Sequence, residues 1–385
     1  MKKLAIVTTH PIQYNVPLFQ LLAVNDGVQI KVFYTWEQSQ QGAKYDPGFG
    51  RHIEWDIPML EGYDYCFVKN TAANPGTHHF NGIVNPGLVK EIEEWAPDAI
   101  LVFGWSFSSH LKCLRYFHGK KHILFRGDST LLDEKPGMRK WIRRLFLKWV
   151  YRHIDSALYV GTNNKNYFLR HGIPEGSLFF APHAIDNDRF AEPDEDYARE
   201  ASLWRSRLGI EADEVVVLFA GKLEPKKNPF FLLDLVKGIP SAKFKVLIIG
   251  NGVLENKLKE RAAGDRRIVF LDFQNQQKMP VVYRLADLFI LPSTGPDETW
   301  GLAVNEAMAC GRAVLVSSKA GCAIDLVRDK ENGLILKGNK EECIDFISGI
   351  LTDKARLAEM GLSSRKIIRQ YSIQKIADAI ISALH

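Results

Sequence analysis

The sequence has few cysteines and no arrangement of them that suggests cross-linking or metal binding. Five are present: Cys66, Cys113, Cys310, Cys322 and Cys343. Their odd number, wide spacing and lack of a Cys-x-x-Cys pair argue against a disulfide framework or a zinc site and favour a reducing compartment. We therefore expect a cytoplasmic protein.

Long apolar runs and a large charge of one sign are also lacking. The longest apolar runs, such as "VVVLFAG" (215–221) and "VLIIG" (246–250), are as long as strands, whereas a transmembrane helix needs about 20 residues. The opening "MKKLAIVTTH" lacks the apolar region and cleavage site of a signal peptide, so we expect it to be a strand. The net charge is only +5.

The sequence does contain an alternation of short apolar runs and helical stretches in both halves. The runs are 3–9, 30–36, 98–104, 122–127 and 156–161, then 214–221, 245–250, 267–273, 287–293 and 312–318. Strands that are apolar on both faces and separated by helices indicate parallel sheets covered on each side. With 385 residues, the chain is expected to form two doubly wound α/β domains.

The acidic segment "AEPDEDYARE" (191–200) is the best candidate for the join between the domains. We expect a first domain over 1–190, a second over 191–362, and a terminal helix over 363–385 that packs back toward the first domain. Ligands of such sheets bind beyond the carboxyl ends of the strands, so the loops after strands are where the chemistry should lie.

One such loop leads into a helix with an unusual carboxylate. In "ETWGLAVNEAMACGRAV" (298–314) a helix is expected to start near Gly301 and to stop at Gly311, with Glu306 among small apolar residues. An unpaired, desolvated carboxylate would cost roughly several kcal/mol. Glu306 must therefore pair internally or face a cavity, where ribose hydroxyls could donate to both of its oxygens.

The start of this helix suits a phosphate, because its first amides lack intrahelical partners and Gly301 allows close approach. Glu298 has a simpler interpretation, since acids are common before helices and Thr299 could act as the cap. Lys222, Lys226 and Lys227 follow the strand expected at 215–220 and could attract phosphate, although Lys226 is expected to be solvated.

These residues resemble retaining glycosyltransferase family 4, the glycosyl transferases group 1, which has the GT-B fold of two Rossmann-like domains facing across a cleft. Glu298 to Glu306 forms a Glu-x7-Glu motif. "AGKLEPKKN" is similar to the Gly-Arg-Leu-x-x-x-Lys segment of the family, "IGNG" to its Gly-x-Gly turn, and "APHAIDNDRF" to the end of its first domain. The resemblance covers most of 155–340. Before it, the likeness is only architectural.

The resemblance implies roles for these residues. Glu306 would hold the ribose, Glu298 the transferred sugar, and Lys227 and Lys222 the departing diphosphate, although the family more often has arginine at 222. The other residues implied to bind the nucleotide sugar are Gly221, Gly250, Gly252, Thr299, Trp300, Gly301 and Leu302. No cofactor or metal is expected, because lysines and a helix start supply the positive charge. The Asp-x-Asp strings at 186–188 and 194–196 do not follow a suitable strand.

The first domain is expected to bind the acceptor, and its polar strand ends are the candidates. His10, Gln13 and Tyr14 follow the first strand, and Arg126 and Asp128 follow another. His10 precedes a proline and could equally serve to close the turn.

Residues 135–152 contain seven Lys or Arg and no acid. The apolar residues there form one helical stripe: Met138, Trp141, Ile142, Leu145, Phe146, Trp149 and Val150. We expect the stripe to pack into the domain core with solvated arginines outside. The alternative is a helix lying on an anionic membrane surface. Nucleic acid is a poor candidate partner, because no binding module accompanies the charge.

The sequence thus predicts a retaining, metal-independent glycosyltransferase that moves a hexose-like sugar from a nucleoside diphosphate sugar to a carbohydrate or lipid-linked acceptor. A role in bacterial surface polysaccharide or glycolipid synthesis, in the cytoplasm or on the inner face of the membrane, would fit. The alternatives are a phosphorylase or nucleotide-sugar hydrolase on the same scaffold, or a non-catalytic protein that binds a sugar nucleotide or a membrane surface.

Overall fold

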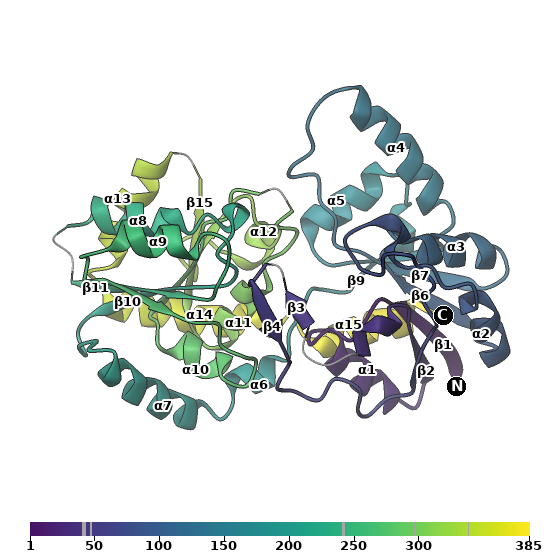
Figure 1. Ribbon diagram of the computed structural model, residues 1–385, viewed down its shortest axis with the longest axis horizontal. Helices are drawn as coiled ribbons and strands as arrows, with labels where there is room; N and C mark the ends of the chain where they lie inside the picture. The colour runs from purple at the N-terminus through teal and green to yellow at the C-terminus, as the bar shows by residue number, and fades with distance from the viewer. Residues whose placement is uncertain (41–43, 47, 241–242, 296, 338) are drawn as a thin grey trace. The chain divides into compact units, whose positions relative to one another are not determined.

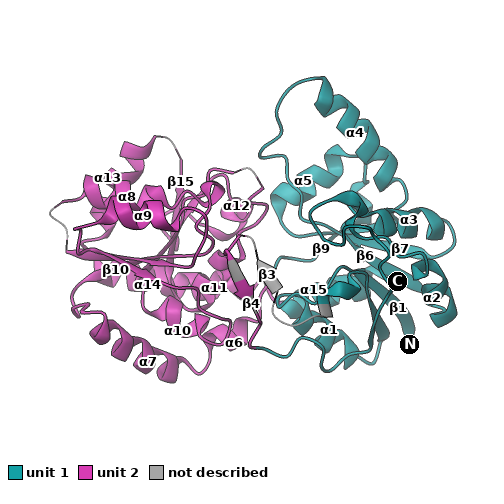
Figure 2. Ribbon diagram, in the orientation of Figure 1, with its two compact units in different colours: residues 1–42, 57–183, 373–385 teal, residues 43–56, 184–372 magenta. Residues whose placement is uncertain are grey.

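The structure is a computed structural model that describes residues 1–40, 44–46, 48–240, 243–295, 297–337 and 339–385. The chain forms two compact units, which are coloured separately in Figure 2. Unit 1 contains residues 1–42, 57–183 and 373–385, and unit 2 contains 43–56 and 184–372. A short segment from the first half of the sequence therefore belongs to the second unit, and the last residues belong to the first.

Unit 1 is built on a seven-stranded parallel sheet with the order β5-β2-β1-β6-β7-β8-β9 (Figure 1). Its strands are β1 (Lys2–Thr8), β2 (Val28–Tyr34), β5 (Tyr65–Phe67), β6 (Ala99–Phe103), β7 (His122–Arg126), β8 (Ser156–Tyr159) and β9 (Leu178–Phe180). The strand order reverses between β1 and β6. In doubly wound sheets the loops on either side of such a switch point form the ligand site.

The helices of unit 1 pack a continuous apolar core against this sheet. They are α1 (Val16–Ala23), α2 (Leu88–Trp95), α3 (Ser108–Phe117), α4 (Met138–Tyr151), α5 (Thr162–Arg170) and α15 (Ile373–Ala383). The last of them, α15, packs against α1, β8 and β9, which confirms that the chain returns to the first domain. The single helix expected over 363–385 is wrong in extent, because a break at 369–372 separates α15 from α14 (Lys354–Ile368).

Helix α4 does not pack as predicted. Five of the seven residues of the expected stripe face outward: Met138, Trp141, Ile142, Leu145 and Phe146 are between 40% and 79% exposed. The other two, Trp149 and Val150, pack on the core as predicted. The buried residues are Arg144, Leu147, Val150 and Tyr151. The prediction assigned the larger apolar face of the helix to the core. The smaller face that is buried includes Arg144, whose charge is paired with Glu134.

Unit 2 is built on a six-stranded parallel sheet with the order β12-β11-β10-β13-β14-β15. Its strands are β10 (Val215–Ala220), β11 (Phe244–Ile249), β12 (Ile268–Leu271), β13 (Leu288–Leu291), β14 (Ala313–Ser317) and β15 (Gly333–Leu336). All ten apolar runs identified in the sequence form strands of the two sheets, as predicted. The switch point of this sheet lies between β10 and β13.

The helices of unit 2 surround a second apolar core. They are α6 (Asn187–Ala191), α7 (Asp194–Arg207), α8 (Phe230–Gly238), α9 (Glu255–Ala262), α10 (Met279–Arg284), α11 (Leu302–Ala309), α12 (Ala323–Leu326), α13 (Lys340–Ile350) and α14. An antiparallel hairpin of β3 (Lys44–Asp46) and β4 (Arg51–Ile53) also belongs to this unit. Within the described residues, no helix is both long and apolar enough to cross a membrane.

Candidate functional site

The loops after β10 and β13 lie on either side of the switch point of unit 2 and are tied together by hydrogen bonds. The amide of Thr294 donates to the carbonyl of Lys226 at 2.9 Å, and the side chain of Asn228 donates to the carbonyl of Pro292 at 3.3 Å. These bonds fix the short 3₁₀ turn Pro225–Lys227 relative to the loop that carries Glu298. Asn228 and Pro292 are more than 60 residues apart in sequence. The two loops that contain them thus bring their side chains to one place.

Lys227 and Glu298 meet at this junction. The Nζ of Lys227 lies 2.5 Å from Oε2 of Glu298, and the hydroxyl of Ser293 donates to the same oxygen at 3.0 Å. Glu298 is only 7% exposed. A buried carboxylate needs this compensation, and the ammonium group and the hydroxyl supply it. Glu298 is therefore more than an acid placed before a helix for the sake of the dipole.

Glu306 is buried on α11, as the sequence predicted, and it has an internal partner. The hydroxyl of Tyr283, on α10, donates to Oε2 of Glu306 at 2.6 Å. Tyr283 is completely buried and Glu306 is 3% exposed. This hydrogen bond offsets part of the cost of burying the carboxylate and fixes the position of one of its two oxygens.

The loop before α11 is held by backbone contacts that require glycine. Gly301 has φ +103°, and a Cβ there would lie 2.7 Å from Cδ2 of Leu291. The loop also rests on the turn after β14, since the amides of Gly321 and Cys322 donate to the carbonyls of Glu298 and Trp300 at 3.0 and 3.1 Å. The start of α11 is therefore fixed before any ligand arrives.

Trp300 adds a side-chain contact to this loop. Its indole Nε1 donates to Oδ1 of Asn305 at 2.9 Å, and both residues are buried. The cap position of the helix is occupied by Gly301 and not by Thr299. Leu302 is the first residue of α11, so its amide is among those that an anion could reach.

Gly221, Gly250 and Gly252 bring the loops after β10 and β11 together. A Cβ at Gly250, where φ is +130°, would lie 2.1 Å from the carbonyl oxygen of Gly221, and one at Gly252 would lie 2.6 Å from that of Leu223. The amide of Leu223 donates to the carbonyl of Asn251 at 3.0 Å. The Gly-x-Gly turn thus has a structural reason in addition to the nucleotide contact that the sequence implied.

Replacing Gly250 with alanine is expected to destabilise the protein by about 1–3 kcal/mol, because the new methyl group would clash with backbone at a strained φ. Urea unfolding of the variant, compared with Gly176→Ala, measures the effect. Nothing lies within 4 Å of a Cβ built at Gly176. Equal midpoints for the two variants would contradict the close approach of the loops.

Lys222 lies against the hairpin that unit 2 takes from the first half of the sequence. Its Nζ is 5.0 Å from the ring centre of Phe49, which in turn packs edge-on against Phe273 at 4.8 Å. The side chain of Asn275 donates to the carbonyl of Glu54 at 2.6 Å and holds the end of the hairpin. Lys222 is thus placed by an aromatic contact, whereas Lys227 is placed by a carboxylate.

No pattern in the sequence predicted this hairpin in unit 2. The run "DPGFG" (46–50) is a local turn signal, but each strand has only three residues. What fixes the hairpin on unit 2 is its packing against Phe273 and Asn275, which lie far away in sequence. Short strands with long-range partners leave no periodic pattern that a single sequence would reveal.

The residues predicted in the first domain separate into two groups. His10 follows β1, where its Nδ1 lies 2.9 Å from the hydroxyl of Thr9 and its ring packs edge-on against Trp36 at 5.3 Å. Gln13 and Tyr14 lie half-buried in the turn between β1 and α1. All three therefore lie at the carboxyl end of the strand beside the switch point of unit 1.

Arg126, at the end of β7, is buried, and it donates to the carbonyls of Ala181 and Pro182 at 2.7 and 3.0 Å. Burial lowers its pKa to about 10. Arg126 therefore holds the segment after β9 against the sheet. Asp128 lies 3.6 Å from Nε2 of His183, a residue that sequence reasoning had not singled out, and burial lowers the pKa of this histidine.

Comparison with known proteins bears on the second unit most directly. The sequence pattern of the family described as Glycosyl transferases group 1 matches residues 201–375, which include Lys227, Glu298 and Glu306. Over this segment the chain is similar to the glycosyl transferases group 1. The match supports the family resemblance found in the sequence, and the roles of Glu298 and Glu306 stay predictions.

Relatives of this chain include a D-inositol 3-phosphate glycosyltransferase from Rhodococcus opacus, 28% identical over 68% of this chain and 60% of that protein. The chain spans between 42% and 62% of the length of such curated relatives. Among solved structures, Anabaena HepE in complex with UDP and glucose matches with a TM-score of 0.70, 17% identity and coverage of 100% and 99% of the two chains. Sucrose-phosphate synthase from Thermosynechococcus elongatus matches with a TM-score of 0.71 and 18% identity, and the match covers 99% of this chain and 97% of that chain. These likenesses and the two sheets give the fold as GT-B.

Proposed function

We propose that this chain is a retaining glycosyltransferase that moves a sugar from a nucleoside diphosphate sugar to an acceptor hydroxyl. The observation that carries the proposal is the ion pair of the half-buried Lys227 with the buried Glu298, beside the start of α11. A cation and unpaired helix amides at the switch point suit a diphosphate, and a neighbouring carboxylate suits the hydroxyls of a sugar. HepE, a solved structure with the same fold, has been captured with UDP and glucose.

In the proposed reaction the bond between the anomeric carbon and the diphosphate oxygen breaks, and the acceptor oxygen bonds to that carbon on the same face. The acceptor's proton passes to the departing diphosphate oxygen, so the products are a glycoside and a nucleoside diphosphate. Negative charge grows on the diphosphate during this step, and Lys227 and the start of α11 would stabilise it. Glu298 would orient both Lys227 and the sugar hydroxyls.

The test is release of nucleoside diphosphate from labelled sugar nucleotides, with and without candidate acceptors. A thermal-shift screen of UDP, GDP, ADP and their sugars first identifies the donor. Release that depends on the acceptor, with retained anomeric configuration in the product, supports the proposal. Release without an acceptor would indicate a hydrolase, phosphate-dependent cleavage a phosphorylase, and binding without release a non-catalytic protein.

We expect the transfer to need no metal ion, because Lys227 and the start of α11 supply positive charge where the diphosphate would lie. Among the described residues, no three His, Cys, Asp or Glu side chains form a group that could hold a metal. Turnover should stay unchanged after dialysis against EDTA and after addition of Mg²⁺ or Mn²⁺. A loss of roughly 10-fold or more that either metal restores would contradict this expectation.

We also propose that the acceptor belongs to a surface polysaccharide or glycolipid under synthesis and is met on the inner face of the cell membrane. The outward-facing stripe of α4 supports this location. Assays with soluble and with membrane-bound acceptors of the same glycan would test it, since only a membrane-presented acceptor gains from an enzyme held at that surface.

A further inference from the structure

Helix α4 has two opposite faces, and only one of them packs against the rest of unit 1. Because an α-helix turns by about 100° per residue, the buried residues Arg144, Leu147 and Tyr151 lie on one side. The exposed residues Met138, Ile142 and Leu145 lie on the opposite side and point away from unit 1. Figure 1 shows α4 on the outside of that unit.

The inner face is anchored by a partly buried ion-pair cluster. Glu134 accepts from Nε and Nη2 of Arg144 at 3.2 and 2.7 Å, and Nζ of Lys140 lies 2.7 Å from the same carboxylate. The two basic residues on the inner side are therefore neutralised within unit 1. They also hold α4 in one orientation, so its exposed stripe stays exposed.

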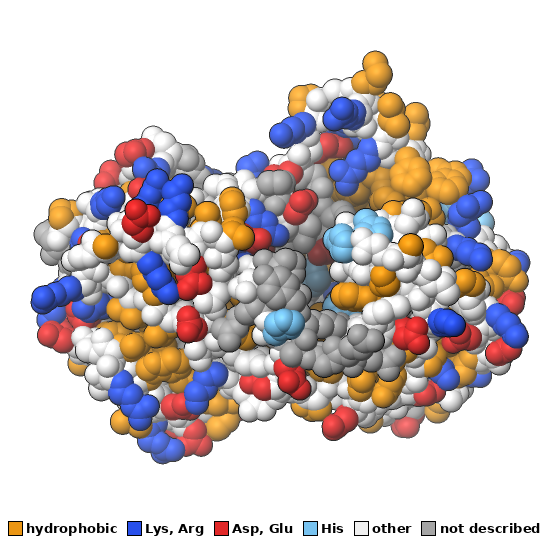
Figure 3. Space-filling model, viewed as in Figure 1, with side chains coloured by type: hydrophobic (Ala, Val, Ile, Leu, Met, Phe, Trp, Pro, Cys, Tyr) orange, Lys and Arg blue, Asp and Glu red, His pale blue; other side chains and the backbone are white. Residues whose placement is uncertain are grey.

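The outer face combines apolar and basic side chains. Its apolar centre consists of Met138, Trp141, Ile142, Leu145 and Phe146, and we call these five residues the outer stripe. Arg139 and Arg143 run along one edge of the outer stripe, and Lys148 and Arg152 run along the other. All four are exposed, and among the described residues no carboxylate lies within ion-pair distance of them. Figure 3 shows hydrophobic side chains beside Lys and Arg over α4.

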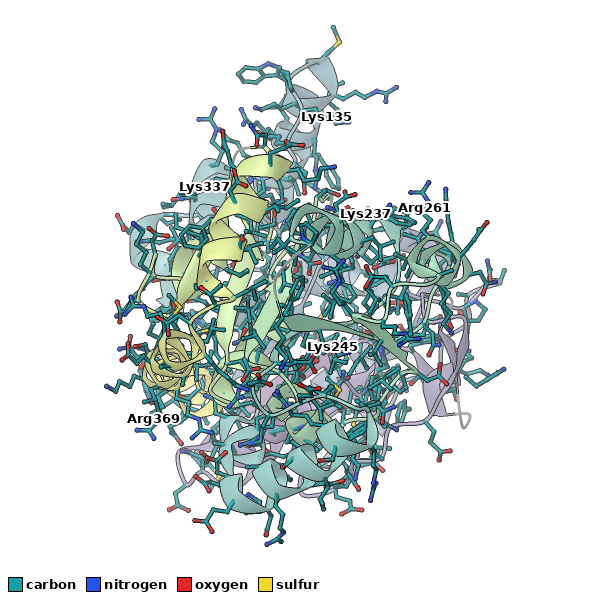
Figure 4. All side chains as sticks on the ribbon, turned by 90° about the vertical axis from the view of Figure 1, so that its left-hand side faces the viewer. Lys135, Lys237, Lys245, Arg261, Lys337 and Arg369 are labelled. Carbon is teal, nitrogen blue, oxygen red and sulfur yellow. The ribbon has the colours of Figure 1, made fainter. Side chains whose placement is uncertain are left out.

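Aromatic contacts extend this surface. Phe146 packs against Trp105 with ring centres 5.4 Å apart and against Trp149 at 5.6 Å, and the guanidinium of Arg115 lies 5.4 Å from the ring of Trp149. Lys135, labelled in Figure 4, is a further exposed cation just before the helix. Tryptophan and arginine side chains with a solvated tip and an apolar body suit the boundary between water and lipid.

We propose that this face of α4 docks on an anionic lipid bilayer. Charge complementarity decides the occupant: α4 contains no acid, and cations flank the apolar centre on both sides, so the phosphates of anionic lipids would meet the arginines while the outer stripe enters the acyl boundary. A protein partner would need acids around an apolar groove of matching length. The proposal deepens the proposed function by naming the surface that receives the enzyme, and it rests on no catalytic residue.

The experiment is co-sedimentation of the full chain with vesicles, without donor or acceptor. Vesicles of phosphatidylcholine alone are compared with vesicles containing about one-third phosphatidylglycerol, at low and at raised salt. We expect binding to the anionic vesicles only, weakened by salt, and a blue shift of tryptophan fluorescence on binding. No binding to the anionic vesicles would overturn the proposal and leave the transfer reaction unaffected.

Two pairs of substitutions separate the apolar and the charged contributions. Ile142→Gln with Leu145→Gln is expected to weaken vesicle binding more than about 10-fold, because the apolar insertion is lost while helix propensity is kept. Arg139→Gln with Arg143→Gln is expected to weaken binding to anionic vesicles by roughly 10- to 30-fold. Neither pair touches the buried face of α4, so circular dichroism and unfolding should be unchanged.

Matched controls come from unit 2. Ile324 and Leu362 are 58% and 61% exposed, and Lys237 and Arg261 are exposed cations labelled in Figure 4. Changing either pair to glutamine should leave vesicle binding unchanged. If these controls weaken binding as much as the α4 variants, or if sedimentation shows that the α4 face instead joins two copies of the chain, the proposal is wrong.

Discussion

Replacing Lys227 with alanine is expected to lower the rate of sugar transfer by about 10²-fold or more. The Nζ of Lys227 lies 2.5 Å from Oε2 of Glu298. A bound diphosphate would compete with Glu298 for this cation. Its electrostatic attraction to the lysine would become stronger as negative charge develops on the leaving group. The effect should therefore appear in kcat, whereas the affinity for the unreacted donor should change less.

The adjacent lysine provides the control for this variant. Lys226 carries the same charge one residue away, but it is paired with Glu224 at 3.6 Å and its side chain is 37% exposed. Lys226→Ala should leave turnover within about two-fold, since exposed ion pairs contribute little. Near-normal turnover of Lys227→Ala, or equal losses in the two variants, would remove Lys227 from the site.

The loss of activity must be distinguished from a loss of stability. Without Lys227, the buried carboxylate of Glu298 keeps only Ser293 as its described polar partner. An uncompensated buried charge destabilises a protein by roughly 3–5 kcal/mol. Adding Glu298→Gln to Lys227→Ala should restore the free energy of unfolding but not turnover. Recovery of both would mean that the lysine acts only by neutralising Glu298.

Periodic, local signals in the sequence were enough to predict both sheets. Most of the ten apolar runs are buried on both faces of their strands, so hydrophobicity marked them, whereas β12 is half-buried along its length. The edge strands β5 and β9 were missed because three half-buried residues do not stand out from loops, and the last strand, β15, was missed because it has only four residues. Helix α11 was found because Gly301 and Gly311 mark its two ends and both adopt positive φ.

The direction in which a helix face packs is harder to predict. In α4 the apolar stripe is longer than the face that is buried. Only tertiary contacts show that Glu134 neutralises Arg144, so that the face carrying this arginine, and not the apolar stripe, packs on the core. A stripe of this kind reads the same way whether it faces a core or a bilayer, because both exclude water.

The candidate site was predictable in its acids and less so in its cations. Glu306 stood out because a carboxylate is costly among alanine, valine and methionine, and the structure buries it as expected. The difference between Lys222 and Lys227 was invisible in the sequence. It depends on Phe49 in one case and Glu298 in the other, and both partners come from distant segments.

Replacing Glu306 with alanine is expected to weaken the binding of the donor by about 10- to 10²-fold, if its carboxylate accepts two hydrogen bonds from the ribose. The ribose is common to the sugar nucleotide and the free nucleoside diphosphate. Calorimetry should therefore show the same loss for both ligands. Glu298→Gln, in contrast, should weaken binding of the sugar nucleotide and leave the free diphosphate largely unaffected.

A ligand that lacks one hydroxyl tests the ribose contact directly. The wild-type protein should bind the 2′-deoxy form of the nucleoside diphosphate more weakly than the ribose form, and Glu306→Ala should no longer distinguish the two. Tyr283→Phe is the structural control: it removes the 2.6 Å hydrogen bond to Oε2 but keeps the carboxylate. If Tyr283→Phe loses affinity as fully as Glu306→Ala, or if the alanine variant still distinguishes the two sugars, then Glu306 serves the packing of α10 against α11 and the ribose is held elsewhere.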